Sequence, residues 1–282
     1  MFTLTAERPD GQRLTLTEYR SAFSVTYTGM GPVAAQVNTS SLGMVNGEKF
    51  NSSRVGSRNV VLTVTISGNV EKNRIRLYQF FSPEMHVKLY YKNGTRDVYT
   101  EGMVEAFECN QFTAMQRAQI SIICPQPYLI GAEEIVQDIS RVLALFEFPF
   151  SISEAGQEFS RLSAEEYAIM ENSGDVATGF IIEVFARAAV TGPVIYNALT
   201  NEAMRISGTL EEGHTLTINT SPGSKKITIT SPTGQVENVL YLKQPGPWLK
   251  LQPGQNYIAY AAQSGADAML VTLRHNNLFV GV

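Results

Sequence analysis

The sequence predicts a mainly β protein of two domains: an N-terminal β-sandwich-like domain with one helix and an extended arm, then a C-terminal β-sandwich. Three observations carry this prediction. The chain has 282 residues, more than one typical domain of ~100–200 residues. Alternating and β-branched runs recur in both halves. Apolar residues make up 44% and charged residues 17% of the chain, so each half can bury a core.

Five runs in the first half have the alternation of strands, and one segment has the spacing of a helix. In the helical segment Asn69 can act as the cap, while Ile75, Tyr78 and either Leu77 or Phe81 recur at helical spacing. Pro83 is expected to end this helix, which should pack on a sheet. The five strand-like runs are RLTLT (13–17), FSVTY (23–27), VVLTVTISG (60–68), HVKLYY (86–91) and RAQISIIC (117–124).

A polar stretch rich in Gly and Ser, residues 38–59, separates the expected strands at 33–37 and 60–68. A structureless loop of roughly twenty residues is uncommon inside a compact domain, so we interpret it as an extended arm. Asn46-Gly47 favours a hairpin within it. The arm carries few large apolar groups and suits contact with another subunit. The candidate contact residues are Asn38, Lys49, Phe50, Arg54 and Arg58.

The domain boundary is predicted near the run ISIICPQPYLIG, where an apolar strand meets two prolines. Pro125 and Pro127 favour extended backbone before them and cannot donate to a sheet, so they end it. Cys124 has no partner at a metal or redox spacing and is interpreted as a buried free thiol. The expected domains are therefore residues 1–130 and 131–282.

The second half begins with an acidic stretch, residues 131–146, that could be partly helical, and stays polar to about residue 177. Short strands then recur at the spacing of a β-sandwich, separated by Pro- and Gly-containing turns such as SPGSKK and QPGPW. The strand-like runs are TGFIIEVFARAAV, VIYNA, MRISG, HTLTIN, KKITIT, VENVLYL, NYIAYAA and AMLVTLR.

Motifs for catalysis, metals and cofactors are missing from the sequence. The three histidines form no paired metal spacing, and Cys109 and Cys124 lack C-x-x-C partners, so we expect no metal and no cofactor. There is no G-x-S-x-G elbow. The run TGMGP (28–32) has G-x-G but no following Lys-Ser/Thr or helix, and it is interpreted as a turn rather than a phosphate loop. We expect a non-enzymatic protein.

Two weaker possibilities for chemistry remain open. The acidic doublets Glu133-Glu134, Glu165-Glu166 and Glu211-Glu212 could supply a pair of glycosidase carboxylates, although doublets in polar loops are more often solvated. Trp248 and Tyr257 are candidate glycan contacts, because a flat ring can stack on a sugar face. The alternative for both rings is ordinary packing in the sandwich.

Charge and hydropathy limit the partners. Residues 1–130 carry 13 Lys and Arg against 10 Asp and Glu, and residues 131–282 carry 9 against 16. This distribution of charged residues lacks the basic stripe of a nucleic-acid binder. No window approaches the ~20 apolar residues of a membrane span, and the N-terminus has no signal-peptide pattern. We expect synthesis in the cytoplasm and no membrane insertion.

Two long runs resemble the distal tail proteins, often called Dit, of long-tailed, non-contractile bacteriophages. The first-half features are the NTSS turn, Phe50-Asn51-Ser52-Ser53, the Asn69-capped helix and the terminal CPQPY. The second-half features are TGFIIEVFARAAVTGPVIYN, GTLEEGHTLTINTSPGSKKITI and the closing LFVGV. The resemblance implies a C-terminal galectin-like β-sandwich, a homo-hexameric ring and a place at the virion tail tip.

The same resemblance implies the partners: the major tail tube protein, a tail-tip or tail-associated protein, and a receptor-binding protein. The leading hypothesis is therefore a structural hub of a phage or prophage tail tip (baseplate). The alternative is a carbohydrate-binding module protein that aids adhesion to the host cell surface.

Overall fold

A computed structural model gives the structure of the chain for residues 2–17, 22–44, 46–111, 113, 115–139 and 167–282. The chain divides into two compact units, Met1–Glu133 with Leu278–Val282, and Glu134–Asn277. The last five residues thus belong to the first unit, and each unit is described by itself below. The mainly β fold class predicted from the sequence is confirmed.

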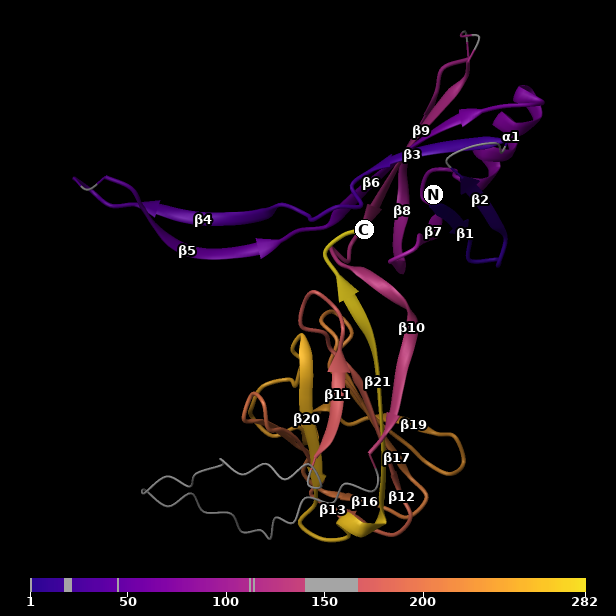
Figure 1. The fold of residues 1–282 in the computed structure, drawn as a ribbon. Coiled ribbons are helices and arrows are strands. Elements are labelled where there is room, and N and C mark those ends of the chain that lie inside the picture. Colours follow the sequence, from indigo (N-terminus) through magenta and orange to yellow (C-terminus); the bar gives the residue numbers. More distant parts are fainter. Residues whose placement is uncertain (1, 18–21, 45, 112, 114, 140–166) are drawn as a thin grey trace. The chain divides into compact units, whose positions relative to one another are not determined.

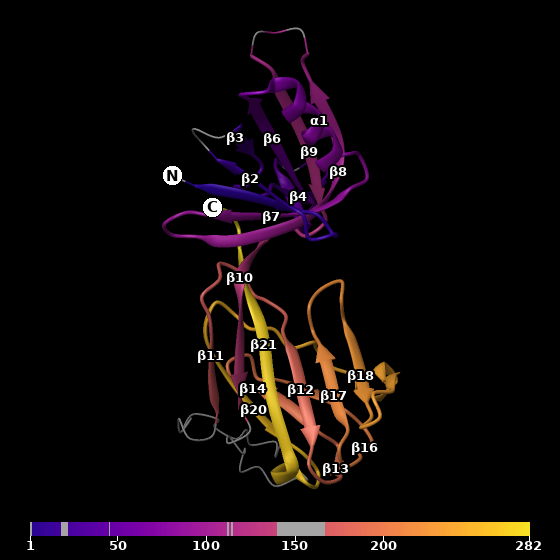
Figure 2. The same cartoon turned by 90° about the vertical axis from the view of Figure 1, so that its right-hand side faces the viewer.

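Seven strands of the first unit close into a barrel (Figure 1, Figure 2). Their order is β8-β7-β1-β2-β3-β6-β9, and β9 pairs back with β8. All neighbours are antiparallel except β2 and β3. The sandwich-like domain expected from the sequence is thus a closed β-barrel. The strands are β1 (Thr3–Glu7), β2 (Arg13–Thr17), β3 (Phe23–Thr28), β6 (Arg58–Ile66), β7 (His86–Lys92), β8 (Asp97–Cys109) and β9 (Arg117–Cys124).

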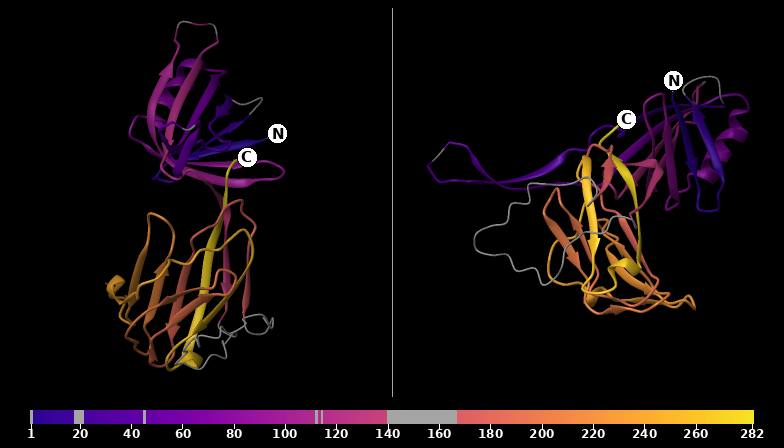
Figure 3. Two further views of the ribbon diagram at one scale, coloured as in Figure 1. Left: turned by 90° about the vertical axis from the view of Figure 1, so that its left-hand side faces the viewer. Right: turned by 60° about the horizontal axis from the view of Figure 1, so that its bottom comes forward.

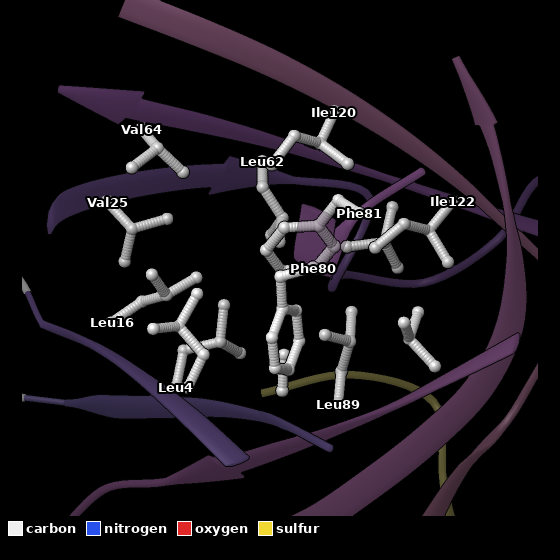
Figure 4. Packing of buried hydrophobic residues seen from close by; sticks show 14 of the residues in the cluster. Leu4, Leu16, Val25, Leu62, Val64, Phe80, Phe81, Leu89, Ile120 and Ile122 are labelled. Carbon is white, nitrogen blue, oxygen red and sulfur yellow. The ribbon is translucent and has the colours of Figure 1, made fainter. Parts of the chain in front are cut away.

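Alternation of side chains along each strand builds the barrel core. In β6, for example, every second residue from Arg58 to Ile66 is buried, as the period of two in a strand requires. Figure 4 shows side chains from several strands and from the helix converging in this core. The labelled members are Leu4, Leu16, Val25, Leu62, Val64, Phe80, Phe81, Leu89, Ile120 and Ile122. Strands β1 and β8 were not predicted from the sequence, whereas the other five were.

The helix α1 (Val70–Phe80) begins at Asn69, whose side-chain oxygen accepts from the Lys72 backbone N–H at 3.2 Å. The cap predicted from the sequence is therefore confirmed. The buried face is formed by Leu77, Phe80 and the C-cap Phe81, whereas Ile75 is exposed. The expectation that Ile75 packs inward was wrong, because the aromatic pair at the end of the helix fills the barrel instead.

Strand β10 (Leu129–Asp138) follows the barrel and pairs with β8 through Ile130 and Gly131. The partly helical start expected at 131–146 is therefore extended as far as Asp138. Residues 140–146 lie outside the described part of the chain.

The second unit is a two-sheet sandwich, in agreement with the prediction (Figure 2). One sheet has the order β19-β18-β17-β12-β21 and the other β11-β20-β14-β15. A short ribbon, β13 with β16, and two 3-10 turns, η1 (Leu240–Leu242) and η2 (Ala266–Ala268), complete it. The strands are β11 (Ala168–Asn172), β12 (Ile181–Ala186), β13 (Val190–Thr191), β14 (Val194–Asn197), β15 (Glu202–Arg205), β16 (Thr209–Leu210), β17 (Thr215–Asn219), β18 (Lys226–Thr230), β19 (Val236–Asn238), β20 (Gly254–Ala261) and β21 (Met269–Phe279).

One inward residue of β21 is a histidine. His275 is 3% exposed, and neither ring nitrogen has a hydrogen-bond partner of normal geometry among the described residues. Burial lowers the pKa of His275 from its ordinary value of 6.5, against smaller opposing effects of Glu171 and Asn277. The ring is therefore neutral in the folded protein at pH 7.

Acidification is expected to destabilise the second unit through His275. Because the folded pKa is lower than the unfolded one, the unfolded chain binds more protons as the pH falls below 6.5. The free energy of unfolding then decreases by up to about 1.4 kcal/mol per pH unit. Urea unfolding at pH 7.5 and 5.5, followed by fluorescence of Trp248, the single tryptophan, measures this loss. His275→Leu should remove most of the difference; an equal pH dependence in that variant contradicts the prediction.

Candidate functional site

The arm predicted from the sequence is a long, exposed hairpin of β4 (Ala35–Ser41) and β5 (Glu48–Val55). The two strands form a separate two-stranded sheet that runs away from the barrel strands (Figure 1, Figure 3). Every residue of β4 is exposed, and so is every residue of β5 except the half-buried Val55. An isolated two-stranded hairpin is only marginally stable in water. The hairpin therefore has the properties of a segment that another surface stabilises.

The hairpin has an apolar face that a β-bulge creates. Strand β5 carries one extra residue, Asn51, so that Thr39 pairs with Phe50. Thr39 and Val37 are two residues apart on β4 and share a face, so Phe50 joins Val37 there. Val37 is 57% and Phe50 60% exposed. Ala35 and Val55, which pair at the base of the hairpin, extend the same apolar face.

The opposite face of the hairpin is polar and internally bonded. The Asn38 amide donates to the Ser52 hydroxyl at 3.1 Å, and the Arg54 Nε donates to Gln36 Oε1 at 3.1 Å. These cross-strand bonds hold the register. Of the residues predicted to contact another subunit, Asn38 and Arg54 lie on this face, Phe50 lies on the apolar face, and Lys49 is exposed opposite Ser40.

Arg58, the fifth residue predicted for the arm, does not belong to it. It is the first residue of β6 and is 1% exposed, so it cannot contact another subunit. The expectation was wrong because Arg58 follows directly on a polar, exposed stretch, and composition alone does not show where the barrel begins. Its side chain has a different role.

The Arg58 guanidinium donates to four backbone carbonyls that come from three separate parts of the first unit. Nη1 donates to the oxygens of Gly29 at 2.6 Å and Gly31 at 2.8 Å. Nε donates to the oxygen of Pro127 at 2.8 Å, and Nη2 to that of Val280 at 2.9 Å. A buried cation held only by carbonyl dipoles has lost its water, and burial lowers its pKa accordingly. Arg58 thus ties the β3 end, the chain after β9 and the C-terminal tail together.

The run TGMGP now has a structural explanation. Its carbonyls point at a cation, whereas a phosphate loop points N–H groups at an anion. Gly29 has φ +82, and a Cβ there would lie 1.9 Å from the Asn59 carbonyl oxygen. Only glycine therefore fits at this position.

Cys124 lies in the barrel core beside this site. It pairs with Arg58 across β6 and β9 and is fully buried. Burial raises the pKa of the Cys124 thiol, despite opposing effects of Thr100 and Arg58. A Cβ at Gly102 would come within 2.8 Å of its sulfur, which shows how tightly the thiol is enclosed. The thiol is packed as a small hydrophobe.

The two free thiols are expected to differ in reactivity, because only Cys109 is partly exposed. In the native protein a water-soluble disulfide reagent should label one thiol per chain rapidly. The variant Cys109→Ser should react only after denaturant is added. Rapid labelling of Cys124 in this folded variant would show that the barrel opens at β9.

The two candidate glycan contacts are placed differently. Trp248 is partly buried against the hydrophobic core of the second unit. The ammonium groups of Lys225 and Lys243 each lie 5.4 Å from the centre of its ring. Tyr257 lies on β20, opposite Ile169, and its hydroxyl donates to Gln255 Oε1 at 3.3 Å. Among the described residues the two rings make no aromatic contact with each other.

The two acidic doublets that the structure describes are exposed to solvent. Glu133 and Glu134 are exposed on β10, and Glu211 and Glu212 are exposed in the turn before β17. Glu165 and Glu166 lie outside the described residues. Within the described ranges no cluster of His, Cys, Asp and Glu could hold a metal ion. The same ranges contain no helix that is long and apolar enough to span a bilayer.

Comparison with known families matches both halves of the chain. Residues 9–124 match the phage tail protein RIFT-related domain, and residues 173–279 match the C-terminal domain of the siphovirus-type tail component. No curated protein sequence gives a significant match. A barrel with a long hairpin, followed by a β-sandwich and matched in this way, defines a structural protein of a phage tail.

Solved structures share this fold over nearly the full chain. The crystal structure of the SPP1 Dit (gp 19.1) protein, described as a paradigm of the hub adsorption apparatus in phages that infect Gram-positive bacteria, has a TM-score of 0.67 at 13% identity, covering 99% of each chain. A chain of the phage P2 baseplate in its activated conformation with Ca has a TM-score of 0.51 at 10% identity, covering 98% of each. The chain belongs to the distal tail protein family of siphophages.

Proposed function

We propose that this chain is the hub of a phage tail tip and that six copies form a closed ring through the β4–β5 hairpin. The observation that carries the proposal is the apolar face of Val37 and Phe50 on a hairpin that is exposed along its length. A neighbouring copy in the ring can cover this face. Six copies is the number that the resemblance to the family implies.

Ring closure suits a hairpin that reaches outward from its own barrel. When a segment docks on a different surface of the next copy, the contact is head-to-tail, and it closes into a ring if the rotation permits. Each contact between two copies can be weak, because every copy in a closed ring is held by more than one such contact. The polar face, already bonded within the hairpin, can remain in solvent.

The remaining parts of the proposal follow from the family. Residues 1–130 form the ring and meet the tail tube protein, and residues 131–282 receive tail-tip or receptor-binding proteins. The protein is made in the host cytoplasm and resides at the virion tail tip. Its role is structural rather than enzymatic, in keeping with the phage tail families that it matches.

Imaging of the purified protein tests the proposal. Negative-stain micrographs should show six-fold rings with a central hole, and mass photometry should give six times the mass of 31.0 kDa. A monomer or a closed dimer at every concentration tested contradicts ring formation by this chain alone.

A further inference from the structure

The lysines of the second unit are gathered in one segment. All four lie between residues 225 and 250, and the same segment holds a single carboxylate, Glu237. The second half as a whole is acidic, with 16 Asp and Glu against 9 Lys and Arg. A local positive region has therefore been placed on an otherwise negative half. The lysines are Lys225, Lys226, Lys243 and Lys250.

Two of these lysines meet at the only tryptophan. The Nζ atoms of Lys225, before β18, and Lys243, after η1, are each 5.4 Å from the centre of the Trp248 ring. Lys243 is held in place, because its Nζ donates to the carbonyl oxygens of Gln244 at 3.1 Å and Gly246 at 2.7 Å. Among the residues that the structure describes, no carboxylate forms an ion pair with either lysine. The cluster thus carries positive charge without a neutralising partner.

The two ammonium groups repel each other. Burial and, next, the charge of Lys225 lower the pKa of Lys243. An anion near both lysines offsets this repulsion and can accept charge-assisted hydrogen bonds from them. Trp248 is half-buried and keeps part of its ring in solvent. The cluster therefore offers a flat apolar ring together with cationic donors.

We propose that Lys225, Lys243 and Trp248 form a binding site for a saccharide that carries a phosphate or carboxylate group. The apolar C–H face of the sugar packs against the exposed part of the indole, and the anionic group contacts the lysines. The cation–π contacts that exist without ligand are loose at 5.4 Å, so a ligand can replace them. This inference does not rest on ring formation, and either can fail without the other.

An acidic protein surface is the competing occupant. Tyr241, 75% exposed, and Leu240, 44% exposed, lie in the same segment and could serve such a surface. A stable protein interface buries about 800 Å² on each partner. The lysine cluster presents one ring and two charges, which is the scale of a single sugar with one anionic group. The saccharide is therefore favoured. A substitution of Tyr241 distinguishes the saccharide from an acidic protein surface.

Fluorescence titration of the full-length protein tests the site, because Trp248 is the only tryptophan. The probes are phosphomannan, polygalacturonate, neutral mannan, inorganic phosphate and poly-glutamate. Phosphomannan or polygalacturonate should change the emission saturably, with an affinity that falls as salt is added. If phosphomannan binds more tightly, the preferred anionic group is a phosphate. If polygalacturonate binds more tightly, it is a carboxylate. Neutral mannan and inorganic phosphate alone should bind much more weakly.

Matched variants locate the binding. Lys225→Gln and Lys243→Gln should each weaken it about tenfold or more, because a charge-assisted hydrogen bond is lost. Lys250→Gln, with the same charge change at an exposed position, should weaken it no more than about twofold. Tyr241→Ser should leave it unchanged. The proposal is overturned by poly-glutamate binding as tightly as the anionic glycan, by equal losses in Lys250→Gln or Tyr241→Ser, or by no saturable response to any probe.

Discussion

Arg58→Met is expected to lower the free energy of unfolding of the barrel by at least about 3 kcal/mol, the largest stability effect that we expect from a single change. The substitution leaves four backbone carbonyls, those of Gly29, Gly31, Pro127 and Val280, without the guanidinium that donates to them. A methionine fills much of the volume but donates nothing. The loss can be followed by thermal unfolding monitored by far-UV circular dichroism, while Trp248 fluorescence reports the second unit separately.

Three comparisons make the Arg58 prediction specific. Arg54→Met removes the same charge from the exposed hairpin and should cost no more than about 0.5 kcal/mol. Arg58→Lys keeps the charge but lacks the planar fork, so its stability should fall between the wild type and Arg58→Met. Deleting residues 280–282 removes one acceptor and should be less than additive with Arg58→Met. If Arg54→Met and Arg58→Met were equally stable, Arg58 would not be the residue that holds the end of β3, the chain after β9 and the C-terminal tail together.

Phe50→Asp is expected to abolish self-assembly while leaving the barrel folded. The change places a charge on the apolar face that Phe50 shares with Val37, and burying an unpaired carboxylate against a neighbouring copy is strongly unfavourable. Because Phe50 is 60% exposed in the single chain, the free energy of unfolding of the monomer should change by less than about 0.5 kcal/mol. Mass photometry and circular dichroism on the same sample measure the two effects.

Two variants control for the hairpin. Ser52→Asp puts the same charge on the polar face and should keep the assembly, although it replaces the hydroxyl that accepts from Asn38. Replacing residues 36–54 by Asn-Gly joins the paired residues Ala35 and Val55 by a tight turn and should yield a folded monomer. Rings formed by the shortened chain would show that the hairpin is not the assembly element.

The local pattern of apolar and polar residues was sufficient to predict many of the strands. The run RAQISIIC is β9 from its first residue to its last, and RLTLT is β2, since alternation marks a strand that is half-buried. Strands β1 and β8 were missed in the sequence analysis. In β8 the alternation is interrupted where its register with β9 shifts between Val104 and Ala106.

The candidate site was predicted only in outline. The polar composition of residues 38–59 correctly marked an exposed hairpin, because few large apolar groups there could form a core. Which side of it is apolar depends on the bulge at Asn51, and an extra residue in a strand leaves no clear mark in sequence. The meeting of Lys225, Lys243 and Trp248 was not visible either, since the path of the chain between residues 225 and 248 decides which of its side chains meet.

The sequence by itself determined the β class of both halves, the capped helix and the exposed arm, because each depends on residues that are near neighbours in the chain. Only the tertiary structure decided the closure of the barrel and the role of Arg58. Its partners lie at positions 29, 31, 127 and 280, and no local pattern relates them. The closed barrel brings these carbonyls to one point, and a single guanidinium with a planar fork of donors contacts all four.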